Sequence, residues 1–207
     1  MPSVPQSFAA DSPWWKGAEW IHQDADLGRL AAAPLRFEHP IPFDLGVDAV
    51  YTLRGPRQVG KSTLLKRIIE ALLLRQGVPP RCILYADIEG AGITTIVRLR
   101  NAINSYVAWV RTSYPDQRIY LFLDEITGVT NWGVTIRTLF RQGALTNATV
   151  VATGSHALDL ARGGETAPGR RGEHHVDHPD WIMMPLAFRD YVAAHAPELV
   201  AALPAID

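Results

Sequence analysis

The sequence predicts an α/β fold in which helices cover both faces of a parallel β-sheet. Two observations predict it: short apolar runs have the length of strands, and amphipathic helical patterns alternate with them. The runs are almost continuously apolar, which is typical of strands buried on both faces of a sheet. The expected strands cover residues 49–53, 82–88, 119–123, 149–152 and 181–184.

Three helices are expected between these strands. The first covers residues 61–75, where leucine and isoleucine recur at helical spacing until Gly77 and two prolines end the pattern. The second covers residues 96–110 and stops near Pro115, and the third covers residues 132–142. Because parallel sheets bind ligands beyond the carboxyl ends of their strands, polar motifs that follow strands are the candidates for function.

The expected domain covers residues 47–195, between an N-terminal arm of residues 1–46 and a tail of residues 196–207. The arm is rich in proline and irregular in pattern, apart from a short helix expected at residues 24–30. Its tryptophans are Trp14, Trp15 and Trp20. Because tryptophan is mostly buried, we expect the arm to pack on the domain. Docking of the arm to a partner is the alternative.

The composition limits the classes of function. The 207 residues carry a net charge of −1, so the composition does not indicate binding to nucleic acid or to a membrane. Cys82 is the only cysteine, and its apolar surroundings in the sequence indicate a buried small side chain and not a reactive thiol. The sequence has no signal-peptide pattern and no apolar stretch of about 18 residues, which predicts a cytoplasmic protein.

A phosphate-binding loop follows the first expected strand. Residues 55–62 read Gly-Pro-Arg-Gln-Val-Gly-Lys-Ser. Glycine lets such a loop turn its amides inward around a phosphate, and the next helix points its N-terminal amides at the same anion. Lys61 is expected to reach the β- and γ-phosphates, and Ser62 to offer its hydroxyl to Mg²⁺. The expected nucleotide-binding residues are Gly55, Pro56, Arg57, Gln58, Val59, Gly60, Lys61, Ser62 and Thr63.

Two carboxylates follow the third expected strand. Asp124 and Glu125 come directly after four apolar residues, which is the pattern of a Walker B motif. Asp124 is expected to hold Mg²⁺, directly or through water, and Glu125 to orient and deprotonate an attacking water. The pair favours ATP hydrolysis over phosphate transfer to a small molecule. The sequence also lacks the Asn-Lys-x-Asp motif of proteins that recognise guanine.

Further candidates follow the fourth strand. Ser155, with Thr153 as the second candidate, is expected to contact the γ-phosphate or the attacking water; a turn stabilised by hydroxyl groups is the alternative. Arg170 or Arg171, in a glycine-rich segment, is a candidate arginine finger for the nucleotide of a neighbouring subunit. A solvated basic loop is the alternative for that segment.

Two other polar groups are interpreted as structural. His174, His175, Asp177 and His178 lie close together in the sequence, but their spacing matches no established metal site, so a polar loop is expected. Asp87 and Glu89 end the second strand near the expected site. A role in orienting water is the alternative for these two carboxylates.

The ordered set of motifs resembles a known family. After the phosphate loop and the Walker B motif come Thr153–Ser155, Pro168–Arg170 and Met184–Tyr191, the last reading Met-Pro-Leu-Ala-Phe-Arg-Asp-Tyr. Over residues 45–195 the chain resembles prokaryotic ATPases of the AAA superfamily whose P-loop domain is followed by a C-terminal domain of unknown function. The resemblance implies a P-loop NTPase of the additional-strand class with strand order 5-1-4-3-2, and ATP and Mg²⁺ as its ligands.

The sequence departs from that family in two ways. Ala187 stands where the family often has serine, and the chain ends at Asp207, before the family's C-terminal domain. A truncated fragment or a short version is therefore expected, and this chain alone is expected to be inactive if that domain is needed. The leading hypothesis is an AAA-like ATPase, for which an arginine acting in trans would require a homo-oligomer. The alternative is an ATP-dependent switch or scaffold with negligible hydrolysis, coupled to a protein or DNA-bound partner.

Overall fold

The computed structural model describes residues 6–17, 19–33, 39–41, 43–155 and 179–202. Five parallel strands form one sheet in the order β2-β3-β4-β1-β5. The strands are β1 (Ala49–Arg54), β2 (Ile83–Asp87), β3 (Ile119–Asp124), β4 (Ala148–Gly154) and β5 (Asp180–Ile182). The predicted α/β class and the order 5-1-4-3-2 are both confirmed.

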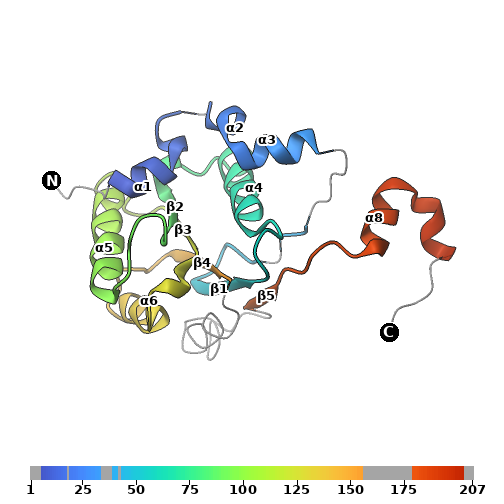
Figure 1. The fold of residues 1–207 in the computed structure, drawn as a ribbon. Helices are drawn as coiled ribbons and strands as arrows, with labels where there is room; N and C mark the ends of the chain where they lie inside the picture. The colour runs from blue at the N-terminus through green and yellow to red at the C-terminus, as the bar shows by residue number, and fades with distance from the viewer. Residues whose placement is uncertain (1–5, 18, 34–38, 42, 156–178, 203–207) are drawn as a thin grey trace.

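Helices cover both faces of the sheet, as Figure 1 shows. Successive residues of β1 divide between two apolar clusters, because side chains alternate across a strand: Val50 faces one cluster and Tyr51 the other. The Val50 cluster includes residues of α5 (Ile96–Ser113) and α6 (Trp132–Arg141). The Tyr51 cluster includes α4 (Lys61–Leu74) and tryptophans of the N-terminal arm. These three helices lie where their apolar spacing predicts them.

The N-terminal arm is more regular than the sequence predicts. It contains α1 (Gln6–Asp11), α2 (Trp20–Gln23) and α3 (Ala25–Ala32). The helix expected at residues 24–30 is α3, and it begins after Asp24 because that carboxylate accepts hydrogen bonds from the amides of Asp26 and Leu27. The expectation of an otherwise irregular arm was wrong, since α1 and α2 are too short to show helical periodicity.

The arm packs against β2, which is an edge strand of the sheet. The indole N–H groups of Trp14 and Trp15 both donate to the carbonyl of Ile83, at 3.0 and 2.9 Å. Trp14 and Trp20 are buried, with 3% and 4% of their surface exposed. The packing of the tryptophans on the domain is therefore confirmed. This contact also covers backbone groups that an edge strand would otherwise leave open to another chain.

The ends of some elements differ from the expected ones. Residues 80–82 form a 3₁₀ turn, so β2 begins one residue after the buried Cys82. Strand β5 begins and ends earlier than expected, and the chain continues to α8 (Phe188–His195), which stands apart from the sheet (Figure 1). Among the described residues, no helix is long and apolar enough to cross a membrane.

Candidate nucleotide-binding site

The phosphate loop depends on two glycines. Gly60 directly precedes the first residue of α4. Its φ of +99° is a backbone conformation that residues other than glycine rarely adopt. Gly55 has φ +156°, and a Cβ atom there would lie 2.2 Å from the carbonyl oxygen of Met183. The loop therefore turns tightly between β1 and α4 and brings the first amides of α4 to its concave side.

Lys61 points its ammonium group back over this loop. The side chain is 5% exposed, and Nζ donates to the carbonyls of Gly55 and Pro56, at 3.0 Å each. Its Nζ also lies 3.8 Å from Oε1 of Glu125. A buried ammonium group beside the loop amides gives this end of the site the charge that phosphate oxygens need.

The carboxylate of Asp124 accepts more hydrogen bonds than the carboxylate of Glu125. Its Oδ2 accepts hydrogen bonds from Ser62 Oγ and Tyr85 OH, at 2.6 Å each. Its Oδ1 accepts from the hydroxyl of Thr153 and, at 3.2 Å, from the amide of Glu125. The side chain is 4% exposed, so these four donors replace the hydrogen bonds that water would make to it. A serine hydroxyl in contact with a carboxylate is a donor set that suits Mg²⁺, which prefers oxygen ligands.

Glu125 is held beside this pair in an unusual backbone conformation. Its φ of +48° lies in the left-handed region, which costs energy for a residue other than glycine. Ser155 holds the carboxylate with its hydroxyl, 2.8 Å from Oε1, and with its amide, 3.1 Å from Oε2. Ser155 thus contacts Glu125, whereas Thr153 contacts Asp124. The strained backbone and the two hydrogen bonds together fix the direction of the Glu125 carboxylate.

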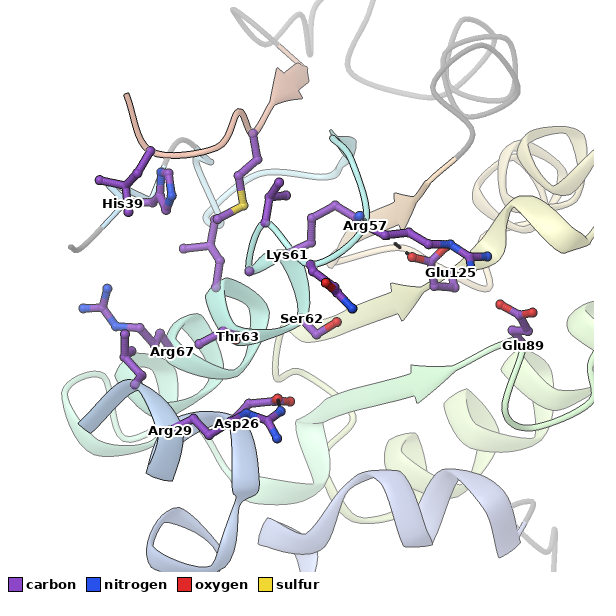
Figure 2. Close-up of a pocket in the computed structure, with 17 residues that line it drawn as sticks. Asp26, Arg29, His39, Arg57, Lys61, Ser62, Thr63, Arg67, Glu89 and Glu125 are labelled. Carbon is purple, nitrogen blue, oxygen red and sulfur yellow. Dashed lines mark hydrogen bonds and ion pairs between the residues drawn. The ribbon is translucent and has the colours of Figure 1, made fainter. Parts of the chain in front are cut away.

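A cavity of about 930 Å³ opens over these residues. Figure 2 shows Lys61, Ser62 and Glu125 at its wall, with Arg57 and Glu89 beside Glu125. Asp26, Arg29, His39, Thr63 and Arg67 lie on the side of the cavity away from Glu125 (Figure 2). The lining also includes Leu30, Leu64, Met183 and Leu186. The volume is in the range of sites for small molecules and cofactors.

The surroundings of His39 favour its neutral form. Burial lowers its pKa below the ordinary value of 6.5, the charge of Arg67 lowers it further, and Asp190 acts in the opposite direction. A neutral imidazole carries one donor and one acceptor nitrogen. This part of the cavity therefore offers apolar surface and hydrogen-bonding groups in addition to the charge of Arg67.

The structure brings most of the predicted site residues together. The loop, Lys61, Ser62, Asp124, Glu125 and both hydroxyl candidates meet at the carboxyl ends of β1, β3 and β4. Arg170 and Arg171 lie outside the described residues, as do His174, His175, Asp177 and His178. Asp87 accepts a hydrogen bond from the amide of Gly90 at 2.9 Å. In the described part of the chain, no group of three or more His, Cys, Asp or Glu is arranged to hold a metal ion.

Three features of the site were not predicted from the sequence. Tyr85 contacts Asp124 from the neighbouring strand, His39 lines the cavity, and α3 contributes Asp26, Arg29 and Leu30 to it. One signal pointed to Tyr85: it stands two residues before Asp87, so both side chains lie on one face of β2. No comparable signal points to His39 or α3.

The strand order, the phosphate loop after β1 and the acidic pair after β3 define a P-loop NTPase of the AAA type. Residues 47–192 match the family described as AAA domain, and the chain belongs to this family. It is therefore a nucleotide-binding protein of AAA type.

The proteins to which the chain is similar include a sequence relative and a solved structure. The uncharacterized protein MJ1637 of Methanocaldococcus jannaschii is 30% identical over 140 residues, which cover 68% of this chain and 27% of that protein. The chain thus spans 27% of the length of this relative. A structure of C. elegans PCH-2 aligns with a TM-score of 0.39 and 13% identity, over 76% of this chain and 41% of that chain.

Proposed function

We propose that the chain binds ATP with Mg²⁺ in this cavity and hydrolyses it to ADP and phosphate. The observation that carries the proposal is that Lys61, Ser62 and Glu125 line one cavity and that Asp124 lies directly behind Ser62. Ser62 Oγ lies 2.6 Å from Asp124 Oδ2, the neighbouring Glu125 carboxylate is fixed by Ser155, and Lys61 lies between Glu125 and the loop. Positioning and charge stabilisation are the main requirements of phosphoryl transfer.

Each side chain has a separate role in this proposal. Lys61 and the amides of the loop bind the β- and γ-phosphates, while the carbonyls of Gly55 and Pro56 give up their hydrogen bonds to Lys61. Ser62 and Asp124 would hold Mg²⁺, which would offset phosphate charge. Glu125 accepts a proton from the attacking water, and Ser155 keeps its carboxylate in place. Thr63 lies next in α4 and lines the cavity beside the loop.

Two variants test this proposal. Glu125→Gln keeps the shape of the side chain and removes the base, so we expect ATP to bind as in the wild type while phosphate release falls about 10²–10⁴-fold. Lys61→Ala removes the ammonium group, so we expect it to weaken ATP binding itself. ATP affinity and phosphate release are measured for both variants. Normal turnover by Glu125→Gln would contradict the role of Glu125 as a base.

The same assay tests whether subunits act on one another. Arg170 or Arg171 acting in trans would require a homo-oligomer, so phosphate release per molecule would rise with protein concentration. Alanine substitutions at the two positions would then identify the arginine. A specific activity that is independent of concentration would contradict an arginine finger in trans.

A nucleotide-dependent switch is the second candidate function, and one observation favours it. Helix α3 lines the cavity through Asp26, Arg29 and Leu30, so a bound nucleotide contacts an element outside the AAA domain match. The switch would present a surface to a protein or DNA-bound partner. It is tested by limited proteolysis: protection by Mg-ATP without phosphate release supports the switch, and equal cleavage with and without nucleotide contradicts it.

A further inference from the structure

Tyr85 is a buried side chain that contacts the site and has no role in the reaction proposed above. It lies on β2 and is 8% exposed, and its hydroxyl donates to Oδ2 of Asp124 at 2.6 Å. The Ser62 hydroxyl donates to the same oxygen at the same distance. The carboxylate of Asp124 is therefore held at this oxygen from two different elements, β2 and α4.

The position of Tyr85 is itself fixed by the N-terminal arm and by α4. Ser12 Oγ accepts a hydrogen bond from the amide of Tyr85 and donates one to its carbonyl, each at 3.1 Å. On the side chain, Lys66 Nζ lies 5.9 Å from the centroid of the ring, within the range of a cation–π contact. Tyr85 therefore has little freedom to move its hydroxyl away from Asp124.

The hydroxyl of Tyr85 is the donor in this contact, because a carboxylate oxygen accepts. Its one proton is directed at Oδ2.

We propose that Tyr85 is a positioning residue for magnesium binding: its hydroxyl holds Asp124 in the orientation that receives the metal. This inference rests on the proposed function, because it takes Ser62 and Asp124 as the groups that hold Mg²⁺. Partners of this kind orient the ligand itself, and their loss typically lowers metal affinity about 10–100-fold. Tyr85→Phe keeps the ring and removes only the donor.

The experiment is a Mg²⁺ titration of ATP binding, followed with a fluorescent ATP analogue. Mg²⁺ should increase the affinity for the analogue, and we expect Tyr85→Phe to raise about tenfold the Mg²⁺ concentration that gives half of this increase. The affinity for the analogue in EDTA, without Mg²⁺, should stay at the wild-type value. If Tyr85 only stabilised the fold, its substitution would change the Mg²⁺ dependence and the affinity in EDTA together. The readout is binding, so it does not depend on turnover.

Tyr106→Phe is the matched control. Tyr106 is also a buried tyrosine whose hydroxyl donates one hydrogen bond, at 3.0 Å to the carbonyl of Arg81, in the apolar cluster on the other face of the sheet. It should lose a similar amount of thermal stability without changing the Mg²⁺ titration. If Tyr85→Phe does not fold, Ser12→Ala loosens the main chain of Tyr85, and a smaller shift in the same direction is expected.

Three outcomes would overturn the inference, and they can be told apart. An unchanged Mg²⁺ titration for Tyr85→Phe would overturn the positioning role alone. Equal shifts for the Tyr85 and Tyr106 variants would show that the effect comes from general loosening of the fold. Absence of Mg²⁺-dependent binding in the wild type would overturn the proposed function and this inference together.

Discussion

At the scale of the residue, Gly55 determines how closely the chain after β5 approaches the phosphate loop. Alanine there would place a Cβ atom 2.2 Å from the carbonyl oxygen of Met183, and a main-chain atom cannot move aside as a side chain can. We therefore expect Gly55→Ala to distort the loop and to weaken ATP binding about tenfold or more, which corresponds to about 1.4 kcal/mol. Binding is measured by titration.

Gly77→Ala is the control for the cost of the backbone conformation. Gly77 also has a left-handed conformation, φ +65°, but nothing lies within 4 Å of the position of its Cβ. This variant should lose about 1 kcal/mol of stability and bind ATP normally. Equal affinity for ATP in both variants would show that the contact with Met183 does not shape the loop.

The residues of the site were predictable where the information is local. The loop of residues 55–62 and the Asp124–Glu125 pair are contiguous motifs, because each must present several groups from one short turn. Tyr85 was missed because its contact with Asp124 depends on the register of β2 against β3, and its spacing from Asp87 indicates only that the two side chains share a face of β2. The contacts of Thr153 with Asp124 and of Ser155 with Glu125 were also missed, because they depend on how β4 pairs with β3.

At the scale of the element, Lys66 fastens α3 to α4. Its Nζ lies 2.8 Å from Asp24 and 2.6 Å from Asp26, and all three side chains are largely shielded from solvent. Hydrogen bonds to charged groups contribute about 1.5–3 kcal/mol, so Lys66→Met should lower the free energy of unfolding by about that amount. It should also speed hydrogen exchange in residues 25–32, which mass spectrometry can measure.

Arg29→Ala provides the comparison. Arg29 pairs with the same Asp26, but its side chain is 76% exposed, and such pairs contribute about 0–1 kcal/mol. The exchange of residues 25–32 should therefore change little in this variant. If Lys66→Met and Arg29→Ala behave alike, Lys66 does not hold α3 in place.

The same ion pairs predict a dependence on pH. Burial alone would raise the pKa of Asp26, but Lys66 and Arg29 outweigh burial and lower that pKa below 3.8. The ion pairs of Asp26 therefore contribute to stability above about pH 4, and this contribution is lost as the pH falls further. Burial alone would lower the pKa of Lys66, but Asp24 and Asp26 raise it above 10.5. That contribution is complete below pH 10.5 and lost at higher pH. We expect the difference in unfolding free energy between wild type and Lys66→Met to shrink at both extremes, as denaturant unfolding can show.

The elements themselves were predictable to different degrees. The helices α4, α5 and α6 and the five strands have apolar patterns that reveal them, with ends shifted by a few residues, whereas α8 was not predicted. The helices α1 and α2 of the arm form because Phe8 of α1 and Trp20 of α2 are buried in the two apolar clusters, and such contacts between distant segments leave no periodic pattern. Strand β5 is shorter than its apolar run, although the amide of Met183, just after it, still donates to the carbonyl of Arg54 at 2.7 Å.

At the scale of the whole molecule, the arm protects the open edge of the sheet. Ser12, Trp14 and Trp15 occupy hydrogen-bonding groups of β2 that would otherwise face solvent. Deletion of residues 1–15 should expose this edge and cause self-association, which light scattering during size-exclusion chromatography can detect. Deletion of residues 1–5 keeps these contacts and should leave the protein as the wild type. A monodisperse 1–15 deletion would contradict the protective role.

The contact between the phosphate loop and the end of β5 also has a mechanical consequence. The main chain of Met183 lies against Gly55, its methyl group reaches the position of a Cβ on Gly60, and α8 begins a short way further on at Phe188. If the loop closes around a phosphate, it would therefore displace Met183. Residues 183–187 are neither helix nor strand and connect Met183 to α8, so a displacement at the loop would reach α8 through this segment (Figure 1).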